Sequence, residues 1–426
     1  MIEIILNNYL NHKSTVYNFF WRSVQVLGKQ GIVFLTFLLC ARLLTPYDFG
    51  IYNYVLAIIF LLITFSDFGI STATSIFVAK YNAINSKKVE NILFNSMLVL
   101  ILIGVVISLL VISFGNVFFK DKYLYILIAL PLIFFSPISS LLDGIFRGLR
   151  RFRELAIISL SVSLFSIGFV YLLVVELGLI GALISQILFY FLLVCFLFLR
   201  YKKITFVFDF MLIKKILSYS FLIGVAAIGG LLYAKIDTII LGQFEFIEEI
   251  GYYEIINKIL QIIIMPIGIL ATVVAPNTIK KIALKQEKQI FVKFKKEIFL
   301  FFLSGVFISL LIYLSLPSLL HFLPKYNIEF FKSLLVVYLF LVPFKLYQVY
   351  LSVAYIVPCG FAKIPLYTLF IFGAANIFLS IVLLNEYGFI GVIYATVITS
   401  VAETLLKTII FYTLYRKKFN LVFIKF

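Results

Sequence analysis

Ten charged residues lie inside long apolar stretches of this chain, where an ionisable side chain is costly. Six are cationic and four are acidic: Arg22, Lys29, Lys235, Lys258, Lys345 and Lys407, and Asp67, Asp237, Glu254 and Glu403. A charge at the centre of a bilayer costs about 2.5–3.5 kcal/mol on insertion scales, so such groups usually face a partner or a water-filled cavity. The surplus of cations predicts a cavity with a positive potential, which its low-dielectric walls strengthen. We expect its ligand to be an anion.

Five of the cations are the residues that we predict to bind this anion. They are Arg22, Lys29, Lys235, Lys258 and Lys345. Arg22 and Lys29 are seven residues apart and therefore share one helix face. None of the five has an acidic residue one turn away on its own helix except Lys258, which follows Glu254 by four residues. A diphosphate on a lipid carrier would suit such a site, and nearby Tyr, Asn and Gln side chains could hydrogen-bond sugars.

Four charged residues are candidates for binding a coupling ion or controlling a gate. They are Asp67, Asp237, Glu403 and Lys407. Glu403 and Lys407 are spaced for a favourable i,i+4 ion pair, and their alternative role is a self-neutralising contact between helices. The alternative role for Asp67 is at a kink or a helix-packing contact. Lys235 and Asp237 lie about 200° apart around a helix, so we expect them to face different neighbours.

The elements that must hold these charges follow from the apolar composition. Of the 426 residues 63% are hydrophobic and 13% are charged, with a mean hydropathy of +1.14, whereas a soluble chain has about 25% charged residues. Apolar runs of about 20 residues recur, and backbone groups in lipid must be paired internally, so the runs predict an all-α integral membrane protein. We place twelve spans at 17–41, 49–79, 91–115, 123–142, 155–175, 179–199, 216–241, 250–275, 298–318, 333–356, 364–384 and 390–414.

Lysine and arginine cluster in every second gap between these runs. The two chain ends and the alternate gaps that match them hold 25 of these residues, and the remaining gaps hold 5. Because positive residues accumulate on the cytoplasmic side of membrane proteins, this pattern predicts that both termini are cytoplasmic. The net charge of +17 therefore reflects orientation, and it gives no reason to expect a nucleic-acid partner.

Short glycine-containing segments recur in the same order in the two halves of the chain. The clearest pair is Glu176–Gly181 and Glu386–Gly391, which are 210 residues apart and each open the sixth predicted span of their half. The repeat predicts two parallel six-helix lobes, residues 1–205 and 206–426, around a central cavity. The second lobe has a basic cytoplasmic loop at about 276–297, which is either an amphipathic helix on the anionic inner leaflet or an ordinary basic loop.

Motifs for enzymatic chemistry are absent from the sequence. There is no Walker motif and no Asp-x-Asp pair for a nucleotide-sugar metal, and neither His12 nor His321 has an evident catalytic partner. The three cysteines, Cys40, Cys195 and Cys359, have the spacing of neither a disulfide framework nor a metal site. We therefore expect no catalytic residue, no metal and no cofactor, and a protein that is not an enzyme.

Five short motifs, individually weak, occur in an order that resembles one family. They are Leu44–Tyr52, Asp67–Gly69, Gly148–Phe152, Asp237–Gly242 and Gly251–Tyr253. On the twelve-span frame they make nearly the whole chain similar to the polysaccharide-biosynthesis flippases, the O-unit or oligosaccharide translocases. That family belongs to the larger multidrug, oligosaccharidyl-lipid and polysaccharide exporter group.

The resemblance implies a two-lobed transporter that alternates between inward- and outward-open states. Its substrate would be an undecaprenyl-diphosphate-linked oligosaccharide, the repeat unit of an O-antigen, capsule or exopolysaccharide, moved from the inner to the outer leaflet of a bacterial cytoplasmic (inner) membrane. Family members carry basic cavity residues on their first, second, seventh and eighth spans. The predicted anion-binding cations occupy the first, seventh and eighth of these, whereas the second has only Arg42 before its start.

The resemblance also implies partners and leaves two alternatives. The partners are membrane lipids, a polysaccharide polymerase, and an H⁺ or Na⁺ gradient or the membrane potential as the energy source. A multidrug or cation antiporter of the same fold is one alternative, and it would favour an acidic cavity. A membrane-embedded glycan polymerase or glycosyltransferase is the other, and it would need an aqueous loop that holds catalytic residues.

Overall fold

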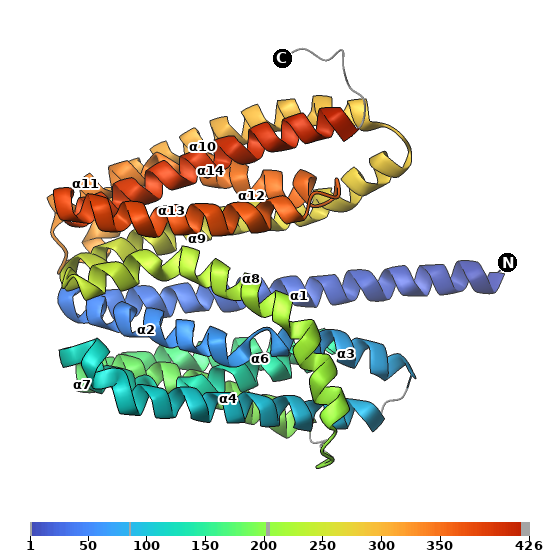
Figure 1. The fold of residues 1–426 in the computed structure, drawn as a ribbon, viewed down its shortest axis with the longest axis horizontal. Coiled ribbons are helices and arrows are strands. Elements are labelled where there is room, and N and C mark those ends of the chain that lie inside the picture. The colour runs from blue at the N-terminus through green and yellow to red at the C-terminus, as the bar shows by residue number, and fades with distance from the viewer. Residues whose placement is uncertain (1, 85–86, 202–204, 419–426) are drawn as a thin grey trace. The chain divides into compact units, whose positions relative to one another are not determined.

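The part of the chain that the structure describes is mostly helical, with short connecting segments (Figure 1). This computed structural model describes residues 2–84, 87–201 and 205–418, and these ranges contain no β-strand. The helices of the first half are α1 (Ile2–Leu43), α2 (Pro46–Asp67), α3 (Ile70–Ile84), α4 (Lys87–Phe119), α5 (Tyr123–Ala129), α6 (Leu132–Gly148) and α7 (Phe152–Tyr201). The helices of the second half are α8 (Phe210–Gln243), α9 (Ile247–Ala283), α10 (Glu287–Phe322), α11 (Ile328–Leu339), α12 (Leu341–Leu351), α13 (Lys363–Tyr387) and α14 (Phe389–Lys418). The expectations for Lys202, Lys203, Lys425 and the chain ends at Met1 and Phe426 lie outside the described residues.

Ten helical segments of the described chain are long and apolar enough to cross a bilayer, so the protein is a multi-pass membrane protein. The difference from twelve arises in two places. α7 has 50 residues and contains the fifth and sixth predicted spans, which meet at the non-helical Gly178. α4 and α5 together form one long segment, Lys88–Ala129, and α6, with 17 residues, is too short to be one of the ten. The count of twelve stays a prediction.

The second predicted span, 49–79, is not one helix, and the expectation of a continuous span is wrong there. α2 ends at Asp67, and the next two residues have left-handed backbone angles, with φ of 38° at Phe68 and 78° at Gly69. A new helix, α3, begins at Ile70. Hydropathy does not register such a turn because both of its residues are compatible with an apolar run.

The fourth predicted span of each half is also interrupted, and at corresponding places. In the first half α5 ends at Ala129 and α6 begins at Leu132, after Pro131. In the second half α11 ends at Leu339, 210 residues after Ala129, and α12 follows directly. α12 then continues into a five-residue π-helix, Ser352–Ile356. The single helix expected over each of these spans is therefore two shorter ones.

The basic segment at 276–297 is helical rather than a loop. It consists of the end of α9 and the start of α10, and the turn between them contains Lys285 with a φ of 57°. Backbone bonds such as Gln286 N to Lys281 O, at 2.9 Å, close the turn. No separate helix lies between α9 and α10 among the described residues.

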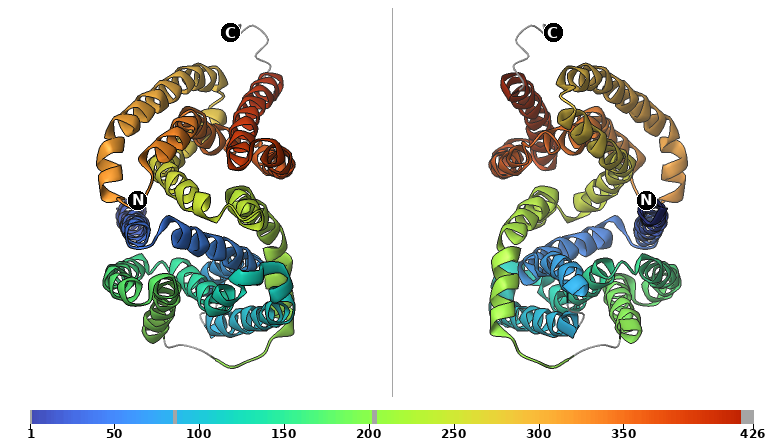
Figure 2. Two further views of the ribbon diagram at one scale, coloured as in Figure 1. Left: turned by 90° about the vertical axis from the view of Figure 1, so that its left-hand side faces the viewer. Right: turned by 90° about the vertical axis from the view of Figure 1, so that its right-hand side faces the viewer.

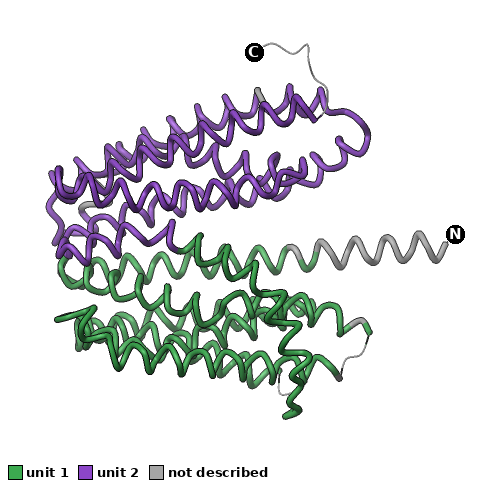
Figure 3. The backbone as a smooth tube through the Cα atoms, viewed as in Figure 1, with its two compact units in different colours: residues 1–231 green, residues 232–426 purple. Residues whose placement is uncertain are grey.

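The chain divides into two compact units, residues 1–231 and 232–426 (Figure 3). The division falls inside α8, and the lobe boundary expected after residue 205 stays a prediction. In unit 1, α1 packs along α7, and α6 lies between α3 and α7. In unit 2, α13 runs beside α14, as Figure 2 also shows, and α12 lies between α9 and α10.

The turns at the two recurring glycine segments have the same geometry. Gly178 has φ 55° and ψ −129°, and Gly388 has φ 61° and ψ −146°. Three residues later, a Cβ on Gly181 would lie 1.8 Å from a backbone oxygen eight residues before it, and one on Gly391 would lie 2.1 Å from the corresponding oxygen. Only glycine fits such close backbone approach. This agreement supports the internal repeat.

Candidate functional site

Arg22 lies in a polar cluster of unit 1 formed by α1, α6 and α7. Its guanidinium donates to Gln25 Oε1 at 2.5 Å and lies 3.9 Å from Asp143 Oδ1. Gln25 is buried, donates to Asp143 Oδ1 at 3.0 Å and lies 3.4 Å from Ser159 Oγ. Asp143 also pairs with Arg147, one turn later on α6, at 2.6 Å. The charge of Arg22 is thus partly balanced by a carboxylate that Arg147 shares.

Lys29 lies two turns further along α1 and has a different environment. Its ammonium is 5.5 Å from the centre of the Phe189 ring on α7, which is a cation–π distance. Among the described residues, the ion pairs within 4.0 Å do not include Lys29. Lys29 therefore carries a positive charge that no adjacent carboxylate balances.

Asp67 is the last residue of α2, and its contacts are those of a helix cap. Its Oδ1 accepts a hydrogen bond from Ser71 N at 3.1 Å and another from the Ser71 hydroxyl. The left-handed Phe68 and Gly69 lie between these two residues, so the carboxylate binds the first turn of α3 across the break. Asp67 therefore has the kink role that the sequence offered as one alternative, and its part in ion coupling stays a prediction.

Lys235 forms an ion pair in unit 2 that sequence spacing did not indicate. Its Nζ lies 2.8 and 2.7 Å from the two carboxylate oxygens of Glu254 on α9. Glu254 is 3% exposed and also accepts from the Thr238 hydroxyl at 2.5 Å. The expectation concerned neighbours one turn away on the same helix, and Glu254 instead binds Lys235 from the adjacent helix through both carboxylate oxygens. Lys235 and Glu254 pair because α8 and α9 come close to each other at this point, which the spacing of residues along α9 does not predict.

Lys345, on α12, begins a chain of polar contacts through the interior of unit 2. Its Nζ donates to the Tyr233 hydroxyl at 3.1 Å and lies 4.9 Å from the centre of that ring. Tyr233 in turn donates to Glu403 Oε2 at 2.8 Å, and the other oxygen of Glu403 pairs with Lys407 at 2.6 Å. The predicted i,i+4 pair is confirmed. The structure adds Tyr233 as the link between that pair and Lys345.

Asp237 is 5% exposed and faces a set of hydroxyl and amide groups. Its Oδ2 accepts from the Tyr253 hydroxyl and from Thr396 Oγ1, the latter at 2.6 Å. Among the described residues, its other oxygen, Oδ1, has no hydrogen-bond partner, and neither has Oδ1 of the buried Asn376. The amide of Asn376 donates to Thr396 Oγ1 at 3.2 Å. Asp237 and Lys235 thus face different neighbours, as expected from their spacing.

A cavity of about 190 Å³ in unit 2 joins these two groups of residues. Both charged side chains in its lining, Asp237 and Lys345, belong to the predicted set. Its other polar lining residues are Tyr233, Tyr253, Asn257, Gln261, Tyr338, Asn376, Thr396 and Ser400. We call it the unit 2 cavity. It holds a carboxylate and an ammonium that are not within 4.0 Å of each other, together with an array of hydroxyl and amide groups.

The unpaired oxygens indicate what the unit 2 cavity could hold. Oxygen ligands are those that hard cations prefer, and a buried acceptor without a donor is costly. Oδ1 of Asp237 and Oδ1 of Asn376 therefore favour a proton or a small monovalent cation beside them. Among the described residues there is no group of three or more His, Cys, Asp or Glu of the kind that holds a transition metal.

Several residues of these sites were missed from the sequence, among them Asp143, Tyr233, Asn376 and Thr396. Asp143 lies at the end of a predicted span, where charged residues are common and do not by themselves indicate a site. Tyr233 is one of 26 tyrosines, so its type carries little information. Asn376 and Thr396 lie within predicted spans. An amide side chain in the middle of a span, such as that of Asn376, is unusual and could have indicated the site.

The structure brings some of the predicted residues together. Arg22 and Lys29 lie on one face of α1 and contact α6 and α7 in unit 1. In unit 2, Asp237 and Lys345 share a cavity, and Glu403 with Lys407 adjoins it through Tyr233. Lys235 forms an ion pair with Glu254, and Lys258 is half-buried four residues after Glu254 on α9. A single site for all five cations stays a prediction.

Comparisons with known structures show the fold. The chain is similar to a multidrug resistance transporter of the MATE family, of the MOP superfamily, in an inward-facing conformation: the TM-score is 0.75 at 15% identity, over 95% of this chain and 96% of that one. It is also similar to the lipid II flippase MurJ in an inward closed conformation, with a TM-score of 0.70 at 18% identity, over 92% of this chain and 87% of that one. A eukaryotic MATE transporter gives a TM-score of 0.59 at 15% identity, over 96% and 98% of the two chains.

Sequence comparison gives the family. No curated protein sequence matches the chain. Residues 15–282 match the profile of a family described as "Polysaccharide biosynthesis protein". Because this match covers more than half of the chain, and the fold is that of membrane transporters and a lipid flippase, the protein belongs to the polysaccharide biosynthesis protein family.

Proposed function

We propose that this protein flips an undecaprenyl-diphosphate-linked oligosaccharide from the inner to the outer leaflet of a bacterial cytoplasmic membrane. It does so by alternating access, with twelve spans in two six-helix lobes, residues 1–205 and 206–426. The cargo is the repeat unit of an O-antigen, capsule or exopolysaccharide, which a polysaccharide polymerase then extends. The observation that carries this proposal is the family match over residues 15–282.

The distribution of charge supports an anionic cargo. Lys29 and Lys345 carry ammonium groups with no carboxylate within 4.0 Å among the described residues, so their charge is available to a ligand. Each lies beside an aromatic ring, Phe189 or Tyr233, which favours a cation without neutralising it. Arg22, Lys235 and Lys258 belong to the same proposed site. Lys235 has the weakest claim because Glu254 binds it through both oxygens.

Charge reversal at Lys29 and Lys345 tests this proposal. Cells that lack the protein should accumulate lipid-linked oligosaccharide on the inner leaflet and lose surface glycan. Lys29→Glu and Lys345→Glu should fail to restore the glycan, although immunoblots of the membrane fraction find normal amounts of protein. Lys29→Arg and Lys345→Arg should restore it in part, and Lys417→Glu, at the exposed end of α14, should restore it fully. Normal glycan from both Glu variants would contradict the anion site.

Cation coupling at Asp237 belongs to the same proposal. Asp237 and Asn376 both line the unit 2 cavity, and the unpaired oxygen of each favours a proton or Na⁺ there. In proteoliposomes with an imposed H⁺ or Na⁺ gradient, Asp237→Asn should flip lipid-linked oligosaccharide at a rate that no longer responds to the gradient. Asp121→Asn, at an exposed position between α4 and α5, is the matched control and should keep the response. An unchanged response of Asp237→Asn would refute the coupling role.

A multidrug or cation antiporter is the second candidate function. The buried carboxylate of the unit 2 cavity favours it, since an acidic group suits a cationic cargo. A deletion strain separates the two functions. Unchanged surface glycan together with raised sensitivity to cationic dyes would favour drug export, and the opposite result favours glycan flipping.

The orientation is a further part of the proposal. With both termini cytoplasmic, a reporter fused after Phe426 should be active only in the cytoplasm. Activity outside the cell would contradict this orientation and would place the C-terminus and the basic loops on the outer side of the membrane.

A further inference from the structure

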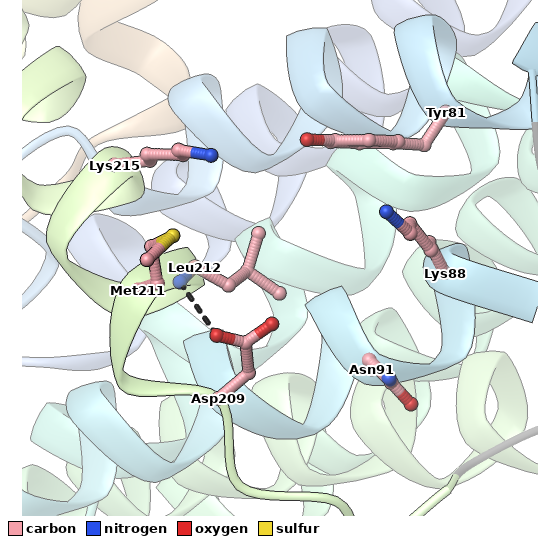
Figure 4. Close-up of a pocket in the computed structure, with 7 residues that line it drawn as sticks. All are labelled: Tyr81, Lys88, Asn91, Asp209, Met211, Leu212 and Lys215. Atoms are coloured by element: carbon pink, nitrogen blue, oxygen red, sulfur yellow. Dashed lines mark hydrogen bonds between the residues drawn. The ribbon is translucent and has the colours of Figure 1, made fainter.

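A second hollow with charged walls lies in unit 1, and none of the predicted anion-binding residues lines it. Its volume is about 180 Å³, and the end of α3, the start of α4 and the start of α8 form it. Its lining residues are Tyr81, Lys88, Asn91, Asp209, Met211, Leu212 and Lys215. Figure 4 shows the Tyr81 hydroxyl and the ammonium groups of Lys88 and Lys215 pointing into one space. We call this the unit 1 hollow.

Hydrogen bonds fix the wall opposite those three groups. The Asn95 amide on α4 donates to Val207 O at 2.9 Å, and its oxygen accepts from Asp209 N at 2.9 Å. Asp209 then caps α8, because its Oδ1 accepts from Leu212 N at 3.0 Å (Figure 4). Val207 and Asp209, just before α8, are thus held against α4 by hydrogen bonds. These bonds fix the shape of this wall of the unit 1 hollow.

The balance of charge in the unit 1 hollow favours an anion. Among the described residues, neither Lys88 nor Lys215 has a carboxylate within 4.0 Å, and Lys88 lies 5.6 Å from the centre of the Tyr81 ring. The Asp209 carboxylate is engaged at the N-terminus of α8, where the helix dipole stabilises negative charge. Two ammonium groups therefore outnumber one committed carboxylate.

A groove continues from the hollow along α3 and α8. It has a volume of about 540 Å³ and shares Met211 and Lys215 with the hollow. Phe77 and Tyr219 line it, and their rings meet edge to face with centroids 5.8 Å apart. The charged hollow could therefore bind the head group of a lipid, and the adjoining aromatic groove could bind its acyl chain.

Large apolar side chains stand exposed beside the hollow. Phe206, Phe208 and Phe210, in and just after the segment tied to α4, are 81%, 61% and 68% exposed. In a membrane protein such rings lie in lipid, at the level where lysines reach the head groups. The connections that hold these lysines are ones that the charge pattern predicts to be cytoplasmic, which is the side of the anionic leaflet.

We propose that the unit 1 hollow binds the phosphate of an anionic glycerophospholipid, with an acyl chain along the adjoining groove. Lys88 and Lys215 neutralise the phosphate, and the Tyr81 hydroxyl donates a hydrogen bond to it. The exposed rings and the groove favour a lipid over a soluble phosphate, because a soluble ligand needs neither. This assignment does not depend on the cargo proposed above.

Lipid binding by the full-length, delipidated protein tests the proposal. Native mass spectrometry with phosphatidylglycerol should give a Kd about 30-fold weaker for the Lys88→Gln/Lys215→Gln double variant. That change equals about 2 kcal/mol at 1.4 kcal/mol per factor of ten, since each lysine near an anionic surface contributes about a fivefold preference. Phosphatidylcholine should bind the wild type no more tightly than phosphatidylglycerol binds the double variant.

Matched variants keep the test decisive. Lys80→Gln/Lys417→Gln removes the same charge from exposed positions outside the hollow and should change the Kd less than twofold. Lys88→Arg/Lys215→Arg should bind like the wild type, which excludes misfolding as the cause. Equal losses in the two Gln pairs, or competition by glycerol phosphate at lipid concentrations, would overturn the proposal. Flipping is measured separately, so loss of lipid binding with flipping intact supports this site without touching the proposed cargo.

Discussion

Unit 1 and unit 2 contain the same turn, but they differ in how exposed an ion pair in each unit is to solvent. The turn that opens the sixth predicted span has nearly the same backbone angles in both, at Gly178 and Gly388. Their ion pairs contrast: the side chains of Arg22 and Asp143 in unit 1 are 36% and 26% exposed, whereas those of Lys407 and Glu403 in unit 2 are 7% and 2% exposed. The frame of the two units is therefore repeated while the environment of the charges is not. Water can screen the Arg22–Asp143 pair of unit 1, whereas Glu403 and Lys407 in unit 2 are shielded from water and depend on each other.

The largest expected effect comes from breaking a buried pair. Lys407→Met leaves Glu403 charged and buried, so we expect the free energy of unfolding to fall by about 3–5 kcal/mol. Asp143→Asn in unit 1 should cost only about 1 kcal/mol or less, because its partners are partly solvated. Thermal unfolding of the purified proteins in one detergent measures both. The double variant Glu403→Gln/Lys407→Met should recover most of the loss. Equal costs of Lys407→Met and Asp143→Asn would show that the two units do not differ in this respect.

A smaller and symmetric effect should come from the shared turn. In Gly181→Ala and Gly391→Ala the added Cβ would lie 1.8 and 2.1 Å from backbone oxygens, so the chain must move. Each should lower the free energy of unfolding by about 3 kcal/mol, the upper end of the usual cost of overpacking. Gly168→Ala is the control, because nothing lies within 4 Å of its Cβ position. A large loss in only one of the two turns would show that the repeat is not structural.

These contrasts mark what the sequence could and could not predict. Apolar runs and recurring glycines are properties of single segments, so the helical frame and the turns at Gly178 and Gly388 followed from them. Pairing of charges depends on helix rotation and depth, which composition does not give. Glu403 and Lys407 were predictable because they share one helix. Lys235 with Glu254 was not, because the two lie on α8 and α9.

The interruptions of helices escaped for a related reason. A left-handed residue such as Phe68 is chosen by the space around it, here a close approach of Gly69 to Gly224 on α8. The segments before and after the break are both compatible with a helix, so the sequence predicted one continuous helix. The two unpaired oxygens of Asp237 and Asn376 are likewise a property of the folded interior.

The second predicted span of each half should respond to the same change with opposite signs. Gly69→Ala places a Cβ at a φ of 78° and 2.9 Å from backbone atoms of α8, so we expect a loss of about 2 kcal/mol. The corresponding stretch of α9 is continuous and contains Gly268, whose nearest neighbour is 3.8 Å from the Cβ position. Gly268→Ala should therefore stabilise the protein by about 0.5–1 kcal/mol. Destabilisation by both variants would mean that α9 also needs its glycine.

The smallest effect concerns the π-helix that only unit 2 has in its fourth predicted span, among the described residues. Ala354 O lacks a helical donor four residues later, because Pro358 has no N–H, and Thr278 Oγ1 on α9 supplies one at 2.9 Å. Thr278→Val keeps the shape and leaves that carbonyl buried and unpaired, which should cost about 1 kcal/mol. Thr278→Ser keeps the hydroxyl and should unfold at nearly the wild-type temperature. If Val and Ser variants unfold alike, the α9 hydroxyl does not stabilise the π-helix, and the difference between the fourth spans must come from packing alone.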